Sequence, residues 1–448
     1  MTTDNDSPQE PEEPGAEFSP THPLLIPAFC SYLMVRLFTI VSATGMRLII
    51  AWQAYIVARD TMSTGWAAAV LGLIGLLQFV PLLVCTPVAG LVADNIKRTL
   101  IAKTTLLLLI GVSLVLAVAS YGGWVSLPLI FFLATMLGAV RAFQGPAIGA
   151  LAPNIVPPLL LPRAIAFSSI TWQTGAIVGP AIAGYAYAWA PHYAYLLSAL
   201  LFGLALGGLV LVGHVPQAPP QKDRHPVRQI LDGLLYVRGN RLVFGAITLD
   251  LFAVLLAGTT ALLPVYAHDL LHVGSKGLGQ LAAAPGIGAA LTAIWFSYSP
   301  LKYNVGPKMM WSVVIFGLAT MLFGATAFMP ESISLNVALA AMVLWGAADM
   351  VSVFVRQTLI QIHTPDAMRG RVGSVSMLTI SASNELGEAE SGFLAALIGP
   401  VAAVIVGGAG AILVTLAWLR LFPELRYARS FDPPEELEKQ SEGGLTAS

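Results

Sequence analysis

Acidic side chains that lie inside long apolar stretches of the sequence are candidates for intramembrane chemistry. Glu385 and Glu388 are three residues apart and would share one face of a helix. Two carboxylates so close in a low-dielectric site cannot both ionise easily, so one of them is expected to bind a proton readily. An ionisable residue at bilayer depth is a functional candidate by default. The acidic proton-coupling candidates are therefore Glu385, Glu388, Asp349 and Asp250, while Glu390 is a candidate for lining a substrate cavity.

Three arginines also fall within the apolar stretches and could pair with these acids. Arg141 would lie about six residues, or roughly 9 Å, inside the end of its helix, where a cation needs a carboxylate. It is therefore a further proton-coupling candidate. Arg47 is a candidate cavity residue that could pair with a carboxylate or an anionic substrate, whereas Arg36 could simply reach the membrane surface. Five acids against three arginines leave some carboxylates without a basic partner. For Glu385 and Glu388, the alternative to proton coupling is a permanent ion pair with one of these arginines.

Polar and aromatic side chains in the same stretches are further candidates for lining a substrate cavity. For the aromatic residues, packing or anchoring at the membrane interface is the alternative interpretation. For Asp250, a buried hydrogen bond is as reasonable as coupling or substrate contact. These cavity candidates are Trp52, Gln53, Tyr55, Gln144, Trp172 and Gln173.

The elements that position these side chains are expected to be membrane-spanning helices. The chain has 448 residues, of which 56% are hydrophobic and 10% are charged, whereas about a quarter of the residues in soluble proteins are charged. Runs such as 106–119 are apolar on nearly every face, unlike the alternating strands of a membrane barrel. At about 20 apolar residues per span, the sequence predicts twelve helices, at 31–58, 65–93, 99–120, 125–147, 162–188, 193–213, 241–268, 278–299, 308–329, 335–360, 370–397 and 400–422.

The basic residues predict which loops are cytoplasmic, because Lys and Arg resist translocation. With this segmentation, 18 of the 23 Lys and Arg residues, Arg356 among them, fall on one side of the membrane. The other side receives only Arg59 and Lys276. Both termini are therefore expected in the cytoplasm. There is no basic region before the first apolar stretch, so no cleaved signal peptide is expected.

Polar segments divide the predicted helices into two bundles of six. The first twenty residues contain six acids and no Lys or Arg, a composition that favours disorder. In 227–238 apolar residues recur at helical spacing, which predicts an amphipathic helix on the inner surface. The predicted parts are a disordered tail at 1–22, an N-terminal bundle at 23–213, a cytoplasmic linker at 214–240, a C-terminal bundle at 241–424 and a disordered tail at 425–448.

An internal repeat supports two related halves. Comparing each residue at 137–184 with the one 208 positions later gives ten identities, where composition alone would give roughly four. Gly179 matches Gly387, and Gly184 matches Gly392. Arg141 matches Asp349, so the two could face each other across a central cavity. Two like halves that rock around a midplane site are a recurrent transporter plan, although small residues also recur in membrane helices because they allow close packing.

The predicted turn between the second and third helices carries a charged motif. It reads Gly-Leu-Val-Ala-Asp-Asn-Ile-Lys-Arg at 90–98, and it resembles the signature loop of the major facilitator superfamily. That resemblance implies the major facilitator fold. It also implies that a small residue lets the helices approach, and that an acid and bases form a lock that steadies one of two alternating states. The residues in question are Gly90, Asp94, Lys97 and Arg98.

Two further motifs are similar to those of the drug–proton antiporters of this superfamily. Helix four carries Arg141 three residues before Gln144, and helix five carries Gly175, Gly179, Pro180 and Gly184, with Ala183 where a glycine is usual. Glycines four apart flatten one helix face for packing, and proline breaks the hydrogen-bond ladder. The glycines and Pro180 therefore have either a packing or a gating role.

The chain also resembles the superfamily branch of siderophore exporters and macrolide-efflux proteins over nearly its whole length. The resemblance rests on Trp-Gln-Ala-Tyr at 52–55, Leu-Pro-Val-Tyr-Ala at 263–267 and the segment 359–371, which ends in the gating candidate Arg371. It implies a monomeric exporter of a small organic molecule, in the bacterial inner membrane and driven by the proton gradient without another cofactor.

Other function classes find little support in the sequence. No phosphate-binding glycine loop, catalytic triad order or metal-ligand spacing stands out, and His268 and His272 lack a third ligand. The net charge of −1 implies no nucleic-acid partner. The alternatives that remain are a lipid or lysolipid translocase of the same fold, and a non-transporting membrane receptor or scaffold.

Overall fold

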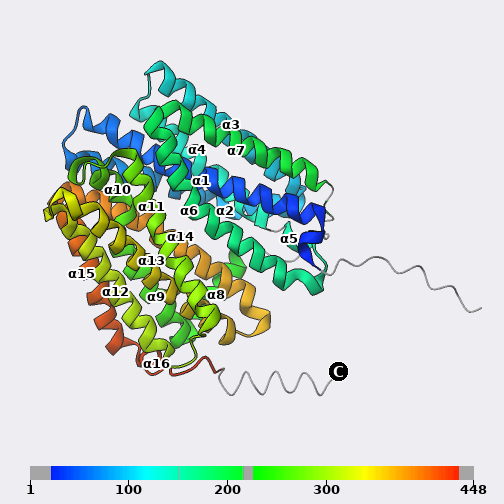
Figure 1. The fold of residues 1–448 in the computed structure, drawn as a ribbon. Helices are drawn as coiled ribbons and strands as arrows, with labels where there is room; N and C mark the ends of the chain where they lie inside the picture. The colour runs from blue at the N-terminus through cyan, green and yellow to red at the C-terminus, as the bar shows by residue number, and fades with distance from the viewer. Residues whose placement is uncertain (1–21, 150, 214, 216–225, 433–448) are drawn as a thin grey trace, which may run out of the picture.

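The computed structural model describes residues 22–149, 151–213, 215 and 226–432, and Figure 1 shows them as an assembly of long helices. The linker residues 214 and 216–225 and the predicted tails up to 21 and beyond 432 lie outside the described residues. The first half consists of η1 (Pro23–Leu25), α1 (Pro27–Arg59), α2 (Thr64–Asn95), α3 (Arg98–Gly122), α4 (Leu127–Gly149), α5 (Ala152–Ile155), η2 (Pro158–Leu160), α6 (Leu161–Trp189) and α7 (Pro191–Val212).

The second half begins with a helix that runs over the predicted amphipathic segment. This half consists of α8 (Pro226–Gly239), α9 (Arg241–Leu256), η3 (Thr259–Leu262), α10 (Leu263–Val265), η4 (Tyr266–Leu270), α11 (Gly274–Tyr298), α12 (Val305–Ala325), η5 (Thr326–Phe328), α13 (Glu331–Ile362), α14 (Asp366–Ile398), α15 (Pro400–Leu421) and α16 (Pro423–Arg426).

The predicted all-α membrane architecture is confirmed. Within the described residues, ten helical segments are long and apolar enough to cross a membrane. The fifth and eleventh predicted helices, α6 and α14, are not among the ten, although both are continuous over at least 29 residues. In α14 the cause is its charged residues, which include three glutamates. The count of twelve spans therefore stays a prediction.

Local sequence explains where the helices begin and end. Pro27, Pro191 and Pro400 stand at helix starts, where a missing N–H leaves no hydrogen bond unmade. Helix α3 ends at Gly122 and is followed by Gly123, whose φ of 70° is left-handed and suits glycine. Asn240 caps α9, because its side-chain oxygen accepts a hydrogen bond from the Val243 N–H at 3.2 Å.

The segment predicted as one helix at 241–268 is broken, which corrects the prediction. The first helix, α9, ends at Leu256, and the chain continues through η3, α10 and the π-helical turn η4. Around Gly258 the chain passes so close to the backbone of Gly387 that a side chain would not fit. The backbone N–H and the hydroxyl of Thr259 both donate hydrogen bonds to the carbonyl oxygen of Ala257, at 2.7 and 3.0 Å. Close packing on α14 therefore overrides the helical periodicity here.

The two halves are related by the repeat and meet through two helix pairs. In the first half α6 packs on α1, and in the second α14 packs on α9. A Cβ on Gly179 would collide with Val41 of α1, and one on its repeat partner Gly387 would collide with Val254 of α9. Between the halves, α2 packs on α14 and α6 packs on α11. Equivalent glycines therefore make equivalent contacts, as two-fold pseudo-symmetry requires.

The halves lie closest at one end of the molecule. We call the end with the α1–α2 turn and the start of α11 the far end, and the end with the start of α1 and the end of α15 the terminal end. Gly65 meets Ala396 and Gly184 meets Gly279, both in the far half of the seam between the bundles. In Figure 1 the halves meet near α10 and spread apart toward α5 and α16. The structure is therefore closed at its far end.

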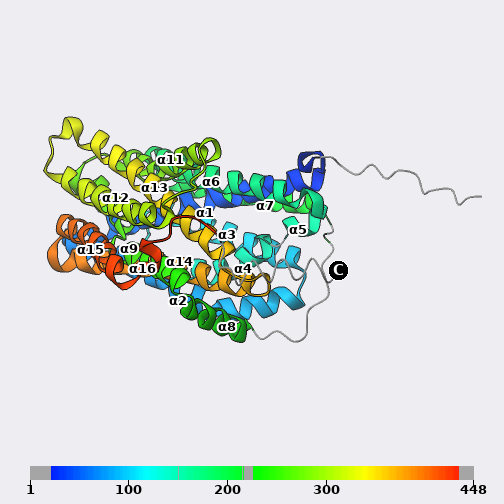
Figure 2. The ribbon, with the colours of Figure 1, turned by 90° about the horizontal axis from the view of Figure 1, so that it is seen from below.

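Two peripheral segments lie on the second half at the terminal end. The helix predicted at 227–238 is confirmed as α8, which lies along α14 and α2 (Figure 2). Residues 425–432 were predicted to belong to a disordered tail, and this is wrong. Leu425 is fully buried, and the Asn304 N–H donates to the carbonyl of Arg429 at 2.5 Å. Burial of Leu425 against the start of α12 holds this stretch in place.

Candidate functional site

Four predicted residues meet at mid-length of their helices and form what we call the central cluster. It consists of Arg47 on α1, Arg141 on α4, and Glu385 and Glu388 on α14. Glu385 Oε1 accepts from Arg47 Nη2 at 2.6 Å and from Arg141 Nη1 at 2.9 Å. Glu388 Oε1 lies 4.0 Å from Arg47 Nη1. Both cations come from the first half and both anions from the second, so every ion pair in this cluster crosses between the halves.

The side chains of the central cluster differ in their exposure to solvent. The Glu385 side chain is 3% exposed, whereas those of Arg47 and Arg141 are 38% and 36% exposed. The second carboxylate oxygen of Glu385 is buried and has no hydrogen-bond partner. Charge-assisted hydrogen bonds of this kind are strong, but they depend on the carboxylate being ionised. Protonation of Glu385 would therefore weaken the connection between the halves at this point.

Small residues allow the two glutamates to reach the seam. A Cβ on Gly75 of α2 would lie 3.3 Å from the Glu385 carbonyl oxygen and 3.4 Å from Glu388 Cβ. Gly138, three residues before Arg141, touches the backbone of Gln78 on α2. Because residues three apart share a helix face, Glu385 and Glu388 both lie on the side of α14 that meets the first half.

At the far end a second polar network joins the halves, which we call the far-end latch. It consists of Tyr55, Arg59, Thr64, His268 and Asp269. Asp269 Oδ2 accepts from the Tyr55 hydroxyl at 2.7 Å, from Arg59 Nε at 2.8 Å and from the Thr64 hydroxyl at 3.1 Å. His268 Nδ1 lies 2.5 Å from Asp269 Oδ1. Nothing in the sequence singles out Asp269, because it stands near a predicted helix end like many solvated acids.

Two aromatic cavity candidates belong to this closed end. Trp52 and Tyr55 are 4% and 0% exposed, and their rings lie 5.7 and 5.9 Å from the ring of His268. In this conformation both side chains are therefore packed inside the protein, and a role in a substrate cavity stays a prediction. The His268 side chain is 40% exposed, and His272 is exposed as well. Packing against the other half of the molecule explains the burial of Trp52 and Tyr55.

Gln53 is buried inside the first half, and its role in a substrate cavity stays a prediction. Its amide donates to the Ser120 hydroxyl at 2.9 Å and accepts from the Tyr195 hydroxyl at 2.5 Å. These partners lie on α3 and α7, so Gln53 holds the first half together from inside. Gln144 is also buried, and its Nε2 has no hydrogen-bond partner.

The remaining cavity candidates have mixed positions. Gln173 on α6 donates to the carbonyl of Gly286 on α11 at 3.0 Å, across the seam between the halves. Trp172 is 52% exposed. Glu390 has a 3.4 Å contact with the hydroxyl of its neighbour Ser391. A substrate role for these three residues stays a prediction.

The predicted gating glycines of α6 serve two different contacts. Gly175 and Gly179 pack on Ile40 and Val41 of α1, inside the first half. Gly184 instead faces α11, where a Cβ would lie 2.8 Å from Gly279 Cα, and Pro180 is buried between them. Of these three glycines, Gly184 therefore bears directly on how the halves meet.

The predicted charged lock at the terminal end is only partly described. Gly90 lies in α2, Lys97 is exposed just before α3, and Arg98 begins α3. The side chain of Asp94 lies outside the described residues, so the lock stays a prediction. Arg371 donates to Asp232 of α8 at 3.1 Å. This bond ties the linker helix to α14.

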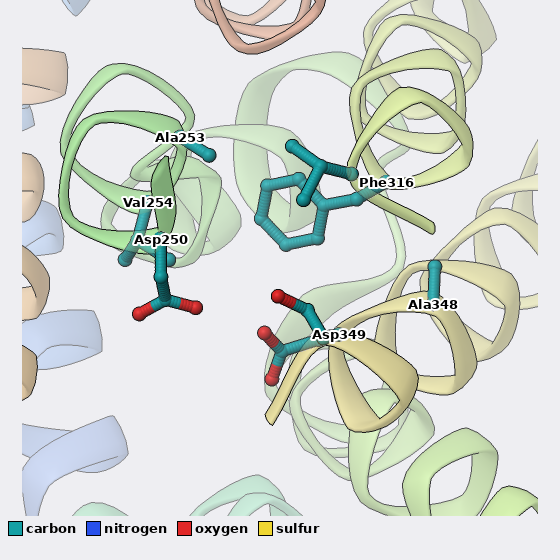
Figure 3. A pocket seen from close by; sticks show the side chains of 8 residues that line it. Asp250, Ala253, Val254, Phe316, Ala348 and Asp349 are labelled. Carbon is teal, nitrogen blue, oxygen red and sulfur yellow. The ribbon is translucent and has the colours of Figure 1, made fainter. Parts of the chain in front are cut away.

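A third charged group lies inside the second half and corrects one prediction. Arg356, which was counted among the loop bases, is 2% exposed and forms an ion pair with Asp250. Asp250 is therefore paired within its own bundle. Arg141 pairs with Glu385 rather than with Asp349. Figure 3 shows the Asp349 carboxyl pointing instead toward Asp250 across a small pocket.

Other possible sites are few. Within the described residues no group of three or more His, Cys, Asp or Glu side chains could hold a metal ion. A largely apolar cavity of about 370 Å³ lies between α2, α3 and α4, and none of the predicted site residues lines it.

Comparisons with known sequences agree on one protein superfamily. A sequence profile described as Major Facilitator Superfamily matches residues 26–388. The chain is similar to the enterobactin exporter EntS of Citrobacter koseri, with 27% identity over 412 residues that cover 91% of this chain and 94% of the relative. EntS of Escherichia coli O1:K1 is 28% identical over 414 residues, with the same coverage.

Solved structures give the same fold. A peptide transporter POT superposes with a TM-score of 0.70 at 13% identity, covering 92% of this chain and all of the other. A D-xylose–proton symporter gives a TM-score of 0.66 at 15% identity, covering 90% of this chain and 97% of the other. Identities this low establish the architecture and not the cargo.

Proposed function

Because this chain belongs to the Major Facilitator Superfamily, and so is a multi-pass membrane transporter rather than an enzyme, we propose that it exports a small organic molecule in exchange for protons. The observation that carries the proposal is Glu385, held between Arg47 and Arg141 across the seam between the halves. A carboxylate there can be ion-paired or protonated, and the two forms hold the halves together to different degrees.

The proposed cycle starts from the conformation closed at the far end. In this conformation Glu385 and Glu388 are ionised and paired with arginine. Cargo enters from the terminal end and reaches the central cluster. Cargo bound between the halves displaces Glu385 from the two arginines, which lets the far-end latch open. After the cargo leaves, protons from outside neutralise Glu385 and Glu388 and favour return. Loss of those protons to the inside restores the ion pairs.

We propose that the terminal end faces the cytoplasm of a bacterial cell and that the membrane is the inner one. With Arg356 buried, 17 of the 23 Lys and Arg residues support this orientation. The cargo is a siderophore or another amphipathic molecule, which the similarity to EntS supports. The side chains of Arg47 and Arg141, more than a third exposed, suit an anionic part of such a cargo.

The test is gradient-driven uptake of enterobactin, erythromycin and a lysophospholipid, each as a separate probe, into inverted membrane vesicles. Uptake of at least one probe is expected to collapse with a protonophore. In Glu385→Gln and Glu388→Gln it should fall by about tenfold or more. Glu331→Gln is the control, because Glu331 is an exposed carboxylate at the start of α13, and uptake by this variant should stay normal.

Normal uptake in both cluster variants, at normal expression, would exclude the assigned coupling role. Movement of the lysophospholipid alone, unaffected by the protonophore, would favour a lipid translocase instead. Binding of a probe without any uptake would favour a receptor.

A further inference from the structure

The buried charges of the second half do not cancel one another. Asp349, Ser352 and Arg356 lie at positions i, i+3 and i+7 of α13, so they share one helix face. Asp250 of α9 faces them and pairs with Arg356. Within the described residues, no hydrogen bond or ion pair reaches Asp349. Two acids against one arginine leave one carboxylate without a counter-charge.

A small pocket lies between these groups. Its volume is about 10 Å³, which is the space of a single water molecule or small ion. Apart from Asp250, Asp349 and Ser352, its lining is apolar and includes Val313 and Phe316 of α12. No other charged side chain of the described chain lines it.

An unpartnered hydroxyl also borders the pocket. Ser352 is 3% exposed, and its Oγ has no hydrogen-bond partner. Buried hydroxyls normally have partners, and here a hydroxyl without one lies beside a carboxylate without a counter-charge. A small cation would fit the pocket and neutralise that carboxylate.

We propose that Asp349, Ser352 and Asp250 form a binding site for one small monovalent cation, in addition to the central cluster. Oxygen atoms of carboxylates and hydroxyls are suitable partners for both H⁺ and Na⁺, and both satisfy the size and charge of the pocket. The site lies wholly within the second half, whereas the central cluster joins the halves. It can therefore be occupied in either conformation, and its occupancy sets the charge of this bundle.

The site can be tested by binding to the purified full-length protein, without any transport. Thermal unfolding is followed in NaCl and in choline chloride at equal ionic strength, from about pH 5 to about pH 8. If the ligand is Na⁺, sodium should raise the Tm by about 2–4 °C. If it is H⁺, the Tm should fall as the pH rises, since the unpaired carboxylate must then lose its proton. In Asp349→Asn the sodium response should disappear, or the pH response should become smaller than in the unmodified protein.

Two controls make the result specific. Asp366→Asn removes an exposed carboxylate that pairs only with Arg369, and it should keep the full response. Glu388→Gln should keep the sodium response and the part of the pH response that depends on Asp349, so failure of the proposed coupling mechanism and failure of this site are distinguishable.

If Asp349→Asn fails to fold, Ser352→Ala replaces it, and the cation response should weaken because one ligand oxygen is lost. An identical Tm response to sodium and to pH in the unmodified protein and in the folded variant would overturn the proposal.

Discussion

At the residue scale, the arginines determine which acids can respond to protons. The central pair Arg47 and Arg141 shares one oxygen of Glu385, and Arg356 holds Asp250 inside a single bundle. Breaking a buried ion pair by removing one partner is strongly destabilising, because the other charge stays buried. The pair inside one bundle should therefore serve stability, while the pairs across the seam serve the change of conformation.

Asp250→Asn should lower the free energy of unfolding by about 3–5 kcal/mol, because Arg356 would lose its counter-charge. Chemical unfolding in detergent measures the change. Asp366→Asn, at an exposed pair, should leave the unfolding midpoint unchanged. The double variant Asp250→Asn with Arg356→Gln should recover part of the loss. Equal stability of Asp250→Asn and the unmodified protein would contradict a structural role for this pair.

Sequence patterns located most of these charged residues but not their partners. Glu385, Arg47 and Arg141 were recognised because they interrupt apolar runs. Arg356 was missed as an intramembrane residue because it stands only six residues before the end of α13, where a base is usually solvated. Which acid meets which base depends on helix rotation and tilt, and periodicity alone does not determine these.

At the element scale, glycines decide how closely helices from different halves approach. Gly184 of α6 faces Gly279 of α11, and Gly72 of α2 faces Gly392 of α14. The sequence predicted packing or gating for the α6 glycines, but it could not say that Gly179 contacts its own half and Gly184 the other. It also missed the break after Leu256, since that break results from packing on α14 rather than from a strong local signal.

Gly184→Leu should prevent α6 and α11 from closing at the far end, because a side chain at this position would collide with the α11 backbone. Uptake of a transported probe is expected to fall by about tenfold while the amount of protein in the membrane stays normal. Gly111→Leu is the control, because a Cβ there meets nothing within 4 Å. Undiminished uptake in Gly184→Leu would show that this contact has no part in the cycle.

At the scale of the whole molecule, the far-end latch holds the described conformation. Asp269 accepts three hydrogen bonds from the first half, including one from Arg59. The sequence predicted two related halves through the repeat, and the glycine contacts agree with it. It gave no information on which conformation the chain adopts, because that depends on small differences between two packings of the same helices.

Asp269→Asn should open the far end more often, because its ion pair with Arg59 is lost. A reporter cysteine, Ser275→Cys in a background with Cys30→Ser and Cys85→Ser, should react about tenfold faster with a membrane-impermeant maleimide added outside, which corresponds to about 1.4 kcal/mol. Asp60→Asn changes an exposed acid next to Arg59 and should leave the rate as it was. A rate unaffected by Asp269→Asn would mean that the latch does not hold this end closed.

In the central cluster the cations and the anions come from different halves of the chain, and this affects how the protein is inserted into the membrane during synthesis. Arg47 and Arg141 lie in the first half, and within the described residues their only acidic partners lie on α14. A ribosome that has finished only the chain up to α7 has therefore produced two cations whose counter-ions are still untranslated. Until α14 is made, water or lipid phosphates must shield them. The charges of the central cluster are thus balanced only when α14 packs against the first half.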